Sequence, residues 1–209
     1  MKNKKTLLIT TIVCLLPILM GLAFYDQLPD QVATHFNSNG VADGYSPKAF
    51  AVFGLPAFLA VVNIIVHLAV DNDPKRDNVS KGINIISKWI APVVSLLINP
   101  VMYLIALGKD LPIVMITSMF IGVLFIILGA YLPKCEQNYT IGIKLPWTLA
   151  DAENWEKTHR LSGYLWIAGG IAVLIAAFFE WSWIFAVVLP VMVLIPMIYS
   201  FVLYKKRNN

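Results

Sequence analysis

The chain has 209 residues, of which 58% are hydrophobic and only 13% are charged, and its mean hydropathy is +0.72. A soluble domain carries about 25% charged residues, so this chain has too few to cover a surface that faces water. This composition excludes an ordinary soluble protein. The net charge of +4 does not indicate nucleic-acid binding, because the basic residues lie between apolar runs and form no patch.

Six apolar runs are each long enough to cross a bilayer. They are residues 6–24, 49–70, 89–107, 112–132, 162–179 and 183–204. The first run follows Lys2, Lys4 and Lys5, as in a signal peptide, but it is longer than the usual apolar region and lacks a small-residue cleavage site. We therefore interpret it as an uncleaved helix. The two cysteines, Cys14 and Cys135, fall at different depths, so we expect no disulfide.

Lysine and arginine residues set the expected orientation of these spans. With the amino terminus inside, the cytoplasmic segments hold 14 of the 16 basic residues and the outer segments hold Lys48 and Lys109. Positive residues concentrate on the cytoplasmic side of membrane proteins. The sequence therefore predicts one all-α membrane domain over residues 1–209, a six-transmembrane-helix bundle with both termini cytoplasmic.

A few polar residues interrupt the spans. We expect Asn63 and Asn99 to form hydrogen bonds between helices. His67 shares a helix face with Asn63, and it either reaches the headgroups or takes part in proton movement. Because no Asp, Glu, Lys or Arg lies deep inside a predicted span, we do not expect an ion-coupled pump.

The longest outer segment, residues 25–48, is rich in turn-forming residues. Residues 32–36 read as a short extended piece, so we expect a compact, ordered loop that either stays structural or docks an extracellular ligand. The spacing of its Asn and Asp residues does not match a calcium loop, and its one His has no second ligand nearby, so we expect no metal site and no cofactor. The residues expected to contact a ligand are His35, Phe36, Asn37, Asp43 and Tyr45.

The cytoplasmic loop 133–161 is the most distinctive stretch of the chain. Thr148 to Asp151 is a capping-box pattern, which predicts a helix that starts near Leu149 and runs into the fifth span. We expect Trp155 and His159 on one face of this helix, at the membrane surface against headgroups or neighbouring helices. The loop is then a structured connector or a binding surface for a cytoplasmic partner.

A catalytic interpretation of this loop rests on Asp151, Thr158 and His159, which are residue types found in hydrolases. Asp151 and His159 are eight residues apart, about two helical turns, which is too far for a hydrogen bond along one helix. Sequence motifs of serine hydrolases, zinc proteases and phosphate-binding loops are absent. We therefore expect no catalytic residues.

Two segments resemble a known family. The loop 129–163 resembles the signature loop of the SdpI family, immunity proteins against a secreted sporulation-delaying (cannibalism) toxin of Gram-positive bacteria. The segment 28–48 resembles the short domain of unknown function attached to that family. The family often has Arg where this chain has Lys144 and Asn where it has Ala130, and Lys keeps the charge but loses the bidentate fork of Arg. The matching positions in the signature loop are Asn138, Gly142, Ile143, Lys144, Pro146, Trp147, Thr148, Leu149, Trp155, Thr158, His159, Arg160 and Gly163.

This resemblance implies a multi-pass protein of the bacterial cell membrane, surrounded by the lipid bilayer, that protects its producer from a membrane-active toxin peptide. It also implies signalling, in which the protein captures a cytoplasmic helix-turn-helix autorepressor when toxin is present. Two other functions remain open: a small transporter or exporter of an amphipathic molecule, and a membrane enzyme. The residues expected to bind the repressor are Asn138, Lys144, Trp147, Trp155, His159 and Arg160.

Overall fold

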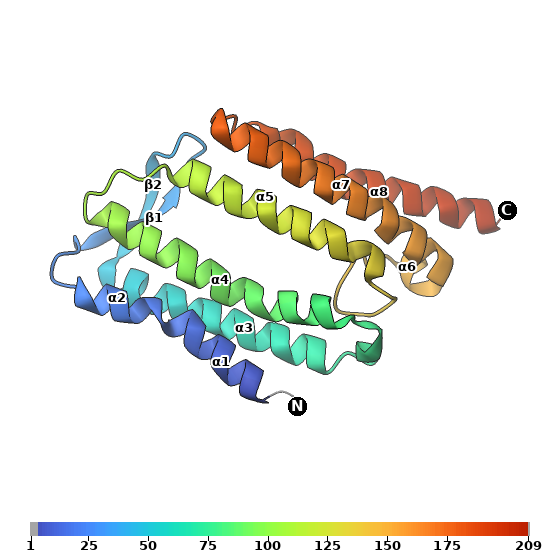
Figure 1. Cartoon of the computed structure of the whole chain (residues 1–209), viewed down its shortest axis with the longest axis horizontal. Coiled ribbons are helices and arrows are strands. Elements are labelled where there is room, and N and C mark those ends of the chain that lie inside the picture. The colour runs from blue at the N-terminus through green and yellow to red at the C-terminus, as the bar shows by residue number, and fades with distance from the viewer. Residues whose placement is uncertain (1–3, 209) are drawn as a thin grey trace. The chain divides into compact units, whose positions relative to one another are not determined.

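The computed structural model describes residues 4–208 and is dominated by six helical segments (Figure 1). Each of the six is long and apolar enough to cross a membrane, so the chain is a multi-pass membrane protein. The segments are α1 (Lys4–Leu15) with α2 (Pro17–Ala23), a π-helical turn (Phe50–Gly54) with α3 (Leu55–Asp71), α4 (Lys81–Ala106), α5 (Ile113–Tyr131), α7 (Ala152–Phe178) and α8 (Ile184–Asn208).

The chain divides into two compact units. Unit 1 holds Met1–Asp71 and Ile85–Ile113, and unit 2 holds Asn72–Asn84 and Val114–Asn209. In unit 1 the first span bends between α1 and α2, where Pro17 stands at the first helical position and has no N–H to continue the α1 hydrogen bonds. Helix α1 packs along α3.

A β-hairpin connects α2 to the second span, within residues 25–48, for which the sequence predicts an ordered loop with an extended piece. Strands β1 (Gln31–Phe36) and β2 (Ala42–Pro47) pair antiparallel. An isolated hairpin is marginally stable in water. This hairpin gains support because Leu28 and Val32 are buried against Ala51, Val52 and Tyr103 of unit 1. The extended conformation predicted for residues 32–36 is therefore present, and it is anchored by apolar side chains.

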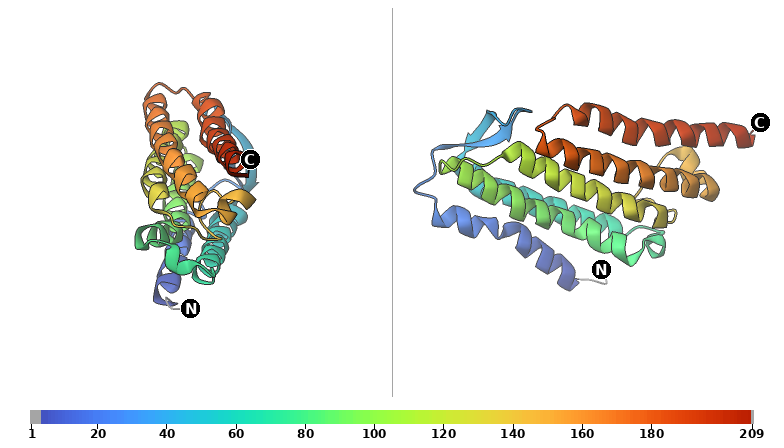
Figure 2. Two further views of the ribbon diagram at one scale, coloured as in Figure 1. Left: turned by 90° about the vertical axis from the view of Figure 1, so that its right-hand side faces the viewer. Right: turned by 45° about the horizontal axis from the view of Figure 1, so that its top comes forward.

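Unit 2 contains most of α5 together with α7 and α8, which lie side by side in both views (Figure 2). Helix α5 approaches α7 closely at two glycine pairs. A Cβ atom on Gly170 would lie 2.6 Å from the carbonyl oxygen of Gly122, and one on Gly163 would lie 2.8 Å from that of Gly129. The absence of side chains at these positions lets the two helices pack at short range.

Helix α4 begins at Lys81, before the apolar run 89–107 that we predict as the third span. One helix start differs from the sequence prediction. Helix α7 begins at Ala152 rather than near Leu149, because Asp151 is its N-cap and accepts hydrogen bonds from the backbone N–H groups of Glu153 and Asn154. Thr148 instead belongs to a separate short helix, α6 (Pro146–Ala150), where its hydroxyl accepts a hydrogen bond from the Leu145 N–H.

Candidate functional site

Residues 135–149 of unit 2 form a compact loop, which we call the signature segment. Asp73 holds this loop against the turn that contains Lys75. Asp73 is 5% exposed. Its Oδ2 accepts hydrogen bonds from the Thr140 hydroxyl at 2.5 Å and the Tyr139 N–H at 2.9 Å, while Oδ1 accepts from the Lys75 N–H at 2.7 Å. Burial alone would raise the pKa of Asp73, but these donors outweigh it and lower the pKa below the ordinary aspartate value.

Further polar contacts tie the segment 72–84 to the signature segment. The Lys75 ammonium donates to Gln137 Oε1 at 2.7 Å, and the Asn78 amide donates to the Gln137 carbonyl at 2.7 Å. Gln137 in turn donates to the carbonyl oxygens of Thr148 and Leu149. One glutamine side chain therefore joins the turn 72–80 to helix α6.

Asn138 shapes the turn of the signature segment from inside. Its Oδ1 accepts from the N–H groups of Thr140 and Ile141, and its Nδ2 donates to the Glu136 carbonyl and towards the Cys135 sulfur. Asn138 is fully buried and Cys135 is 4% exposed. Burial is also the main reason that the pKa of the Cys135 thiol is raised. Asn138 is thus a structural residue and not a surface contact.

Trp155 and His159 of α7 are buried beneath the signature segment, in contact with protein and not exposed. They are 2% and 0% exposed, and their rings stack at 4.0 Å. His159 Nδ1 contacts the Trp155 carbonyl at 2.8 Å, and His159 Nε2 accepts from the Ile143 N–H at 2.9 Å. The Trp155 indole donates to the Cys135 carbonyl at 2.6 Å. Both side chains hold the segment against α7.

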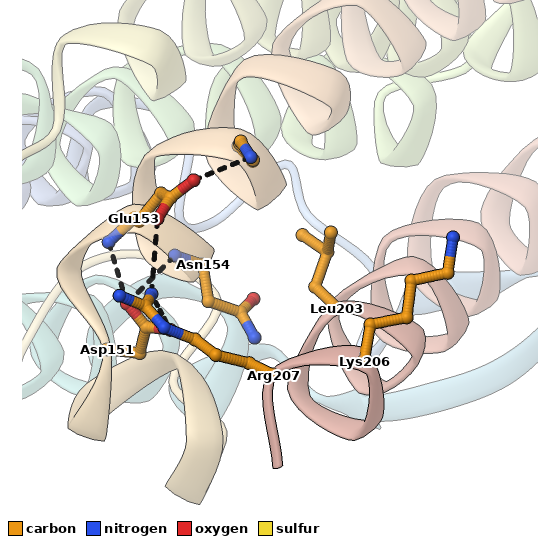
Figure 3. A pocket seen from close by; sticks show the side chains of 7 residues that line it. Asp151, Glu153, Asn154, Leu203, Lys206 and Arg207 are labelled. Atoms are coloured by element: carbon orange, nitrogen blue, oxygen red, sulfur yellow. Dashed lines mark hydrogen bonds and ion pairs between the residues drawn. The ribbon is translucent and has the colours of Figure 1, made fainter. Parts of the chain in front are cut away.

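The carboxyl-terminal part of α8 is fastened to the start of α7 by polar contacts. The Trp147 indole donates to the Ser200 hydroxyl at 2.9 Å, and buried Asn154 donates to the Ser200 carbonyl. Figure 3 shows Arg207 reaching Asp151 and Glu153, at 2.5 Å and 3.2 Å. Burial by itself would raise the pKa of Asp151. The hydrogen bonds from Arg207 and from two backbone N–H groups have the larger, opposite effect, so the pKa lies below its ordinary value.

The candidate partner-binding residues therefore separate into two groups. Asn138, Trp155 and His159 are buried, whereas Lys144 and Arg160 are exposed and Trp147 is half-buried. The Lys144 ammonium donates to the carbonyl oxygens of Tyr139 and Thr140. Tyr139, which is not among the residues expected from sequence, is 50% exposed beside Lys75. The sequence feature that could have indicated Tyr139 is an aromatic residue within a polar turn.

On the hairpin, the structure brings His35 and Asp43 together across the two strands. His35 Nδ1 lies 2.5 Å from Asp43 Oδ1, and their side chains are 73% and 45% exposed. Tyr45 is 60% exposed, and Phe36 is half-buried. Asn37 instead orders the turn, because its Oδ1 accepts from the N–H groups of Asn39 and Val41. An exposed polar and aromatic face is thus present at His35, Asp43 and Tyr45.

Unit 1 also contains a buried ion pair, which joins the end of α3 to the early part of α4. Lys88 lies seven residues inside α4, and its side chain is 3% exposed. Its ammonium lies 2.5 Å from Asp71 Oδ1 at the end of α3. This pair is not evident from sequence, because Lys88 stands directly before the predicted span 89–107, where a loop lysine is expected.

The structure also places Asn99, the two cysteines and the residue types of a metal or hydrolase site. Asn99 donates to Ser95 on its own helix, while Ser95 donates to the Cys14 carbonyl of α1. Cys14 and Cys135 are both free and buried. Residues 4–208 contain no group of three or more His, Cys, Asp or Glu side chains placed to hold a metal. Asp151 binds Arg207 and both His159 nitrogens are engaged within the fold, so these residues do not form a hydrolase arrangement.

The comparisons with known proteins match this part of the chain and its amino-terminal part, and one relative matches along the full length. Residues 134–200 match the SdpI/YfhL protein family, and residues 12–60 match the Domain of unknown function (DUF1648). The chain is 24% identical over 209 residues to the immunity protein SdpI of Bacillus subtilis (strain 168), covering 99% of both chains. No solved structure matches. The region that contains the signature segment, α7 and most of α8 thus resembles the SdpI/YfhL protein family, and the multi-pass membrane protein is similar to the immunity protein SdpI along its whole length.

Proposed function

We propose that this chain is a membrane immunity protein that protects its cell from a secreted, membrane-active peptide toxin. The observation that carries this proposal is the full-length similarity to the immunity protein SdpI. We further propose that toxin binding is sensed at the hairpin and that the signature segment then captures a cytoplasmic helix-turn-helix autorepressor. Survival of a toxin-sensitive strain that expresses the chain tests the protective function directly.

This proposal requires the hairpin outside the cell and the signature segment in the cytoplasm. The distribution of basic residues supports that topology, with both termini inside. Reporter fusions after Lys48 and Lys109 should report an outside location, while fusions after Asn78, after Lys134 and at the carboxyl terminus should report an inside location. An outside signal at the carboxyl terminus would contradict the six-span topology.

For the hairpin, we predict that His35→Ala combined with Phe36→Ala weakens toxin protection and signalling together. Losing a hydrogen-bonding group and an aromatic contact should cost about 2 kcal/mol of binding, or about a thirtyfold change in affinity. The measurement is the toxin concentration that halves survival, with protein level in the membrane recorded in parallel. The matched control is Gln31→Ala, an exposed position on the same strand. Full resistance at normal abundance would contradict sensing by this face.

For the signature segment, we propose that the exposed residues Lys144 and Arg160 form the partner surface, with Trp147 at its edge. Lys144→Gln with Arg160→Gln removes two positive charges and keeps hydrogen-bonding groups, so we expect loss of repressor capture without loss of the fold. Recovery of the repressor in the membrane fraction measures capture. Lys81→Gln, an exposed lysine at the start of α4, is the control. Undiminished capture by the double variant would exclude this surface.

The buried Lys88–Asp71 pair favours a second candidate function, transport of an amphipathic molecule, because charged groups within spans often mark transport pathways. Export and immunity by binding differ in one measurable respect. An exporter lowers the amount of toxin held by the cells, whereas a binding protein leaves it unchanged or raises it. Cell-associated labelled toxin, compared between expressing and non-expressing cells, therefore distinguishes the two.

A further inference from the structure

A cavity of about 270 Å³ lies between the start of α7 and the end of α8, within unit 2 (Figure 3). Three basic and two acidic side chains line it, together with Asn154 and Leu203, so the formal charge of its walls is +1. The pairing of these charges and the position of the cavity along the helices together indicate which ligand it suits.

The two carboxylates of the cavity already have donors within the fold. Arg207 Nη1 lies 2.5 Å from Asp151 Oδ2 and 3.2 Å from Glu153 Oε2. Glu153 Oε1 accepts from the Lys157 ammonium at 2.7 Å. Asp151 Oδ1 accepts from two backbone N–H groups in the first turn of α7. Each carboxylate oxygen therefore has a donor, and the acids have little capacity left to hold a cation.

Donors remain in excess at this cavity. An ammonium group has three N–H bonds and a guanidinium has five. The ion pairs of Arg207 use one nitrogen, and Lys157 makes one such contact. The ammonium of Lys206 makes no hydrogen bond or ion pair with residues 4–208, and Figure 3 shows it apart from the Arg207 ion pairs. The cavity thus offers unused N–H groups and one surplus positive charge, which suits an anion with several oxygen atoms.

The length of α8 places this cavity at the level of lipid headgroups. Helix α8 begins at Ile184, directly after Trp181 and Trp183, which are 48% and 60% exposed. Exposed tryptophan side chains favour the interface between the hydrocarbon core and the headgroups. Lys206 is twenty-two residues further along α8, about 33 Å at 1.5 Å per residue, and the hydrocarbon core is about 30 Å thick. The cavity therefore lies among the headgroups of the opposite leaflet.

An apolar face of α8 leads from the cavity towards the hydrocarbon core. Leu203, Tyr199 and Ile195 follow one another at intervals of four residues, so they share one side of the helix. Ile195 is 42% exposed, and the other two are half-buried. Acyl chains can pack on this face, whereas a free phosphate ion gains nothing from it. The face therefore favours a phosphate that is attached to acyl chains.

We propose that this cavity binds the phosphate group of an anionic phospholipid, with Lys206 as the main donor and with support from Arg207 and Lys157. The acyl chains of this lipid pack along the α8 face from Leu203 to Ile195. The inference does not depend on the immunity function, because it rests on the charges and the position of the cavity alone.

The test is native mass spectrometry of the full chain in detergent micelles, titrated with dioleoyl phosphatidylglycerol. Lys206→Gln should weaken binding of the first lipid about fivefold, the contribution of one lysine near a membrane surface, and Lys206→Glu about twenty-five-fold. Lys205→Gln is the matched control, because Lys205 is adjacent and equally charged but lies over the Phe201 ring and does not line the cavity. It should change the affinity less than twofold. Circular dichroism checks that each variant keeps its helical content.

Competing ligands identify the source of the phosphate. Inorganic phosphate and glycerol phosphate should displace the lipid only weakly at equal concentration, because neither meets the apolar face of α8. Full displacement by inorganic phosphate would overturn the assignment to a lipid, and tighter binding of a glutamate-rich peptide than of the lipid would do the same in favour of a protein partner. Equal affinities of the Lys206→Gln and Lys205→Gln variants would show that the lipid responds only to the general positive charge at this end of α8, and the proposed site would be wrong.

Discussion

Replacing Asp71 with Ala should lower the free energy of unfolding by about 3–5 kcal/mol. The reason is that Lys88, whose side chain is 3% exposed, would lose the carboxylate that lies 2.5 Å from its ammonium. A buried charge without a partner costs far more than an exposed one, because the surroundings cannot replace its hydration. The measurement is reversible unfolding of the purified chain in mixed micelles, followed by circular dichroism.

The matched control for this prediction is the double variant Asp71→Ala with Lys88→Met. It removes both charges and keeps an apolar side chain of similar length at position 88, so its stability should lie closer to the original than that of the single variant. The difference between the two variants isolates the cost of the unpaired ammonium. A single variant as stable as the unmodified chain would show that Lys88 reaches water or another acceptor.

Asp73→Asn should open the signature segment and raise the alkylation rate of Cys135 about thirtyfold. In the unmodified chain three donors share the two carboxylate oxygens of Asp73, and the substitution removes the negative charge and leaves these donors a single oxygen. We expect this to lower the local stability of the signature segment by about 2 kcal/mol. Since each 1.4 kcal/mol is about a factor of ten in the population of the open state, the rate rises about thirtyfold. Cys135 is 4% exposed, so it reacts through opening of the segment. The measurement uses a Cys14→Ser background, in which Cys135 is the one thiol.

Asp77→Asn is the control for the Asp73 variant, because Asp77 lies in the same turn and its side chain is 100% exposed. The lowered pKa of Asp73 also sets a direction with pH. Its stabilising contribution is present above the ordinary aspartate pKa of 3.8 and is lost as the pH falls through the lower pKa of the folded state. Cys135 should therefore stay protected at neutral pH and lose protection only in acid. Equal rates in the Asp73 and Asp77 variants would contradict the role of Asp73.

The six spans were predictable from sequence because apolar length is a local property that the bilayer thickness fixes. The number and order of the spans are confirmed. The start of a helix differs from the prediction where the residue that caps it was not the one expected from sequence. Asp151 and Thr148 illustrate this point. Both residues fit an N-cap pattern, but Thr148 is used inside α6 and Asp151 caps α7. The capping-box pattern at Thr148 therefore predicted the helix start a few residues too early, because packing of the signature segment places Thr148 in a separate helix.

The candidate site was less predictable, because burial is a tertiary property. The resemblance located the signature loop, but residue type alone could not show that Asn138 and His159 face inward while Lys144 and Arg160 face outward. The turn 72–80 carries no motif in the sequence, and only its contacts with Gln137 and Thr140 reveal it as part of the site. Lys88 was similarly hidden, because a lysine beside an apolar run usually lies in a loop.

The central claim, that this chain confers immunity, is most directly tested in a toxin-sensitive strain that lacks its own immunity gene. The strain would carry the chain, an empty vector or the Asp73→Asn variant under one promoter, and it would be challenged with the purified peptide toxin. We predict survival with the unmodified chain, death with the vector and intermediate survival with the variant at equal membrane abundance. Death of cells that contain the unmodified chain at normal abundance in the membrane would contradict the claim.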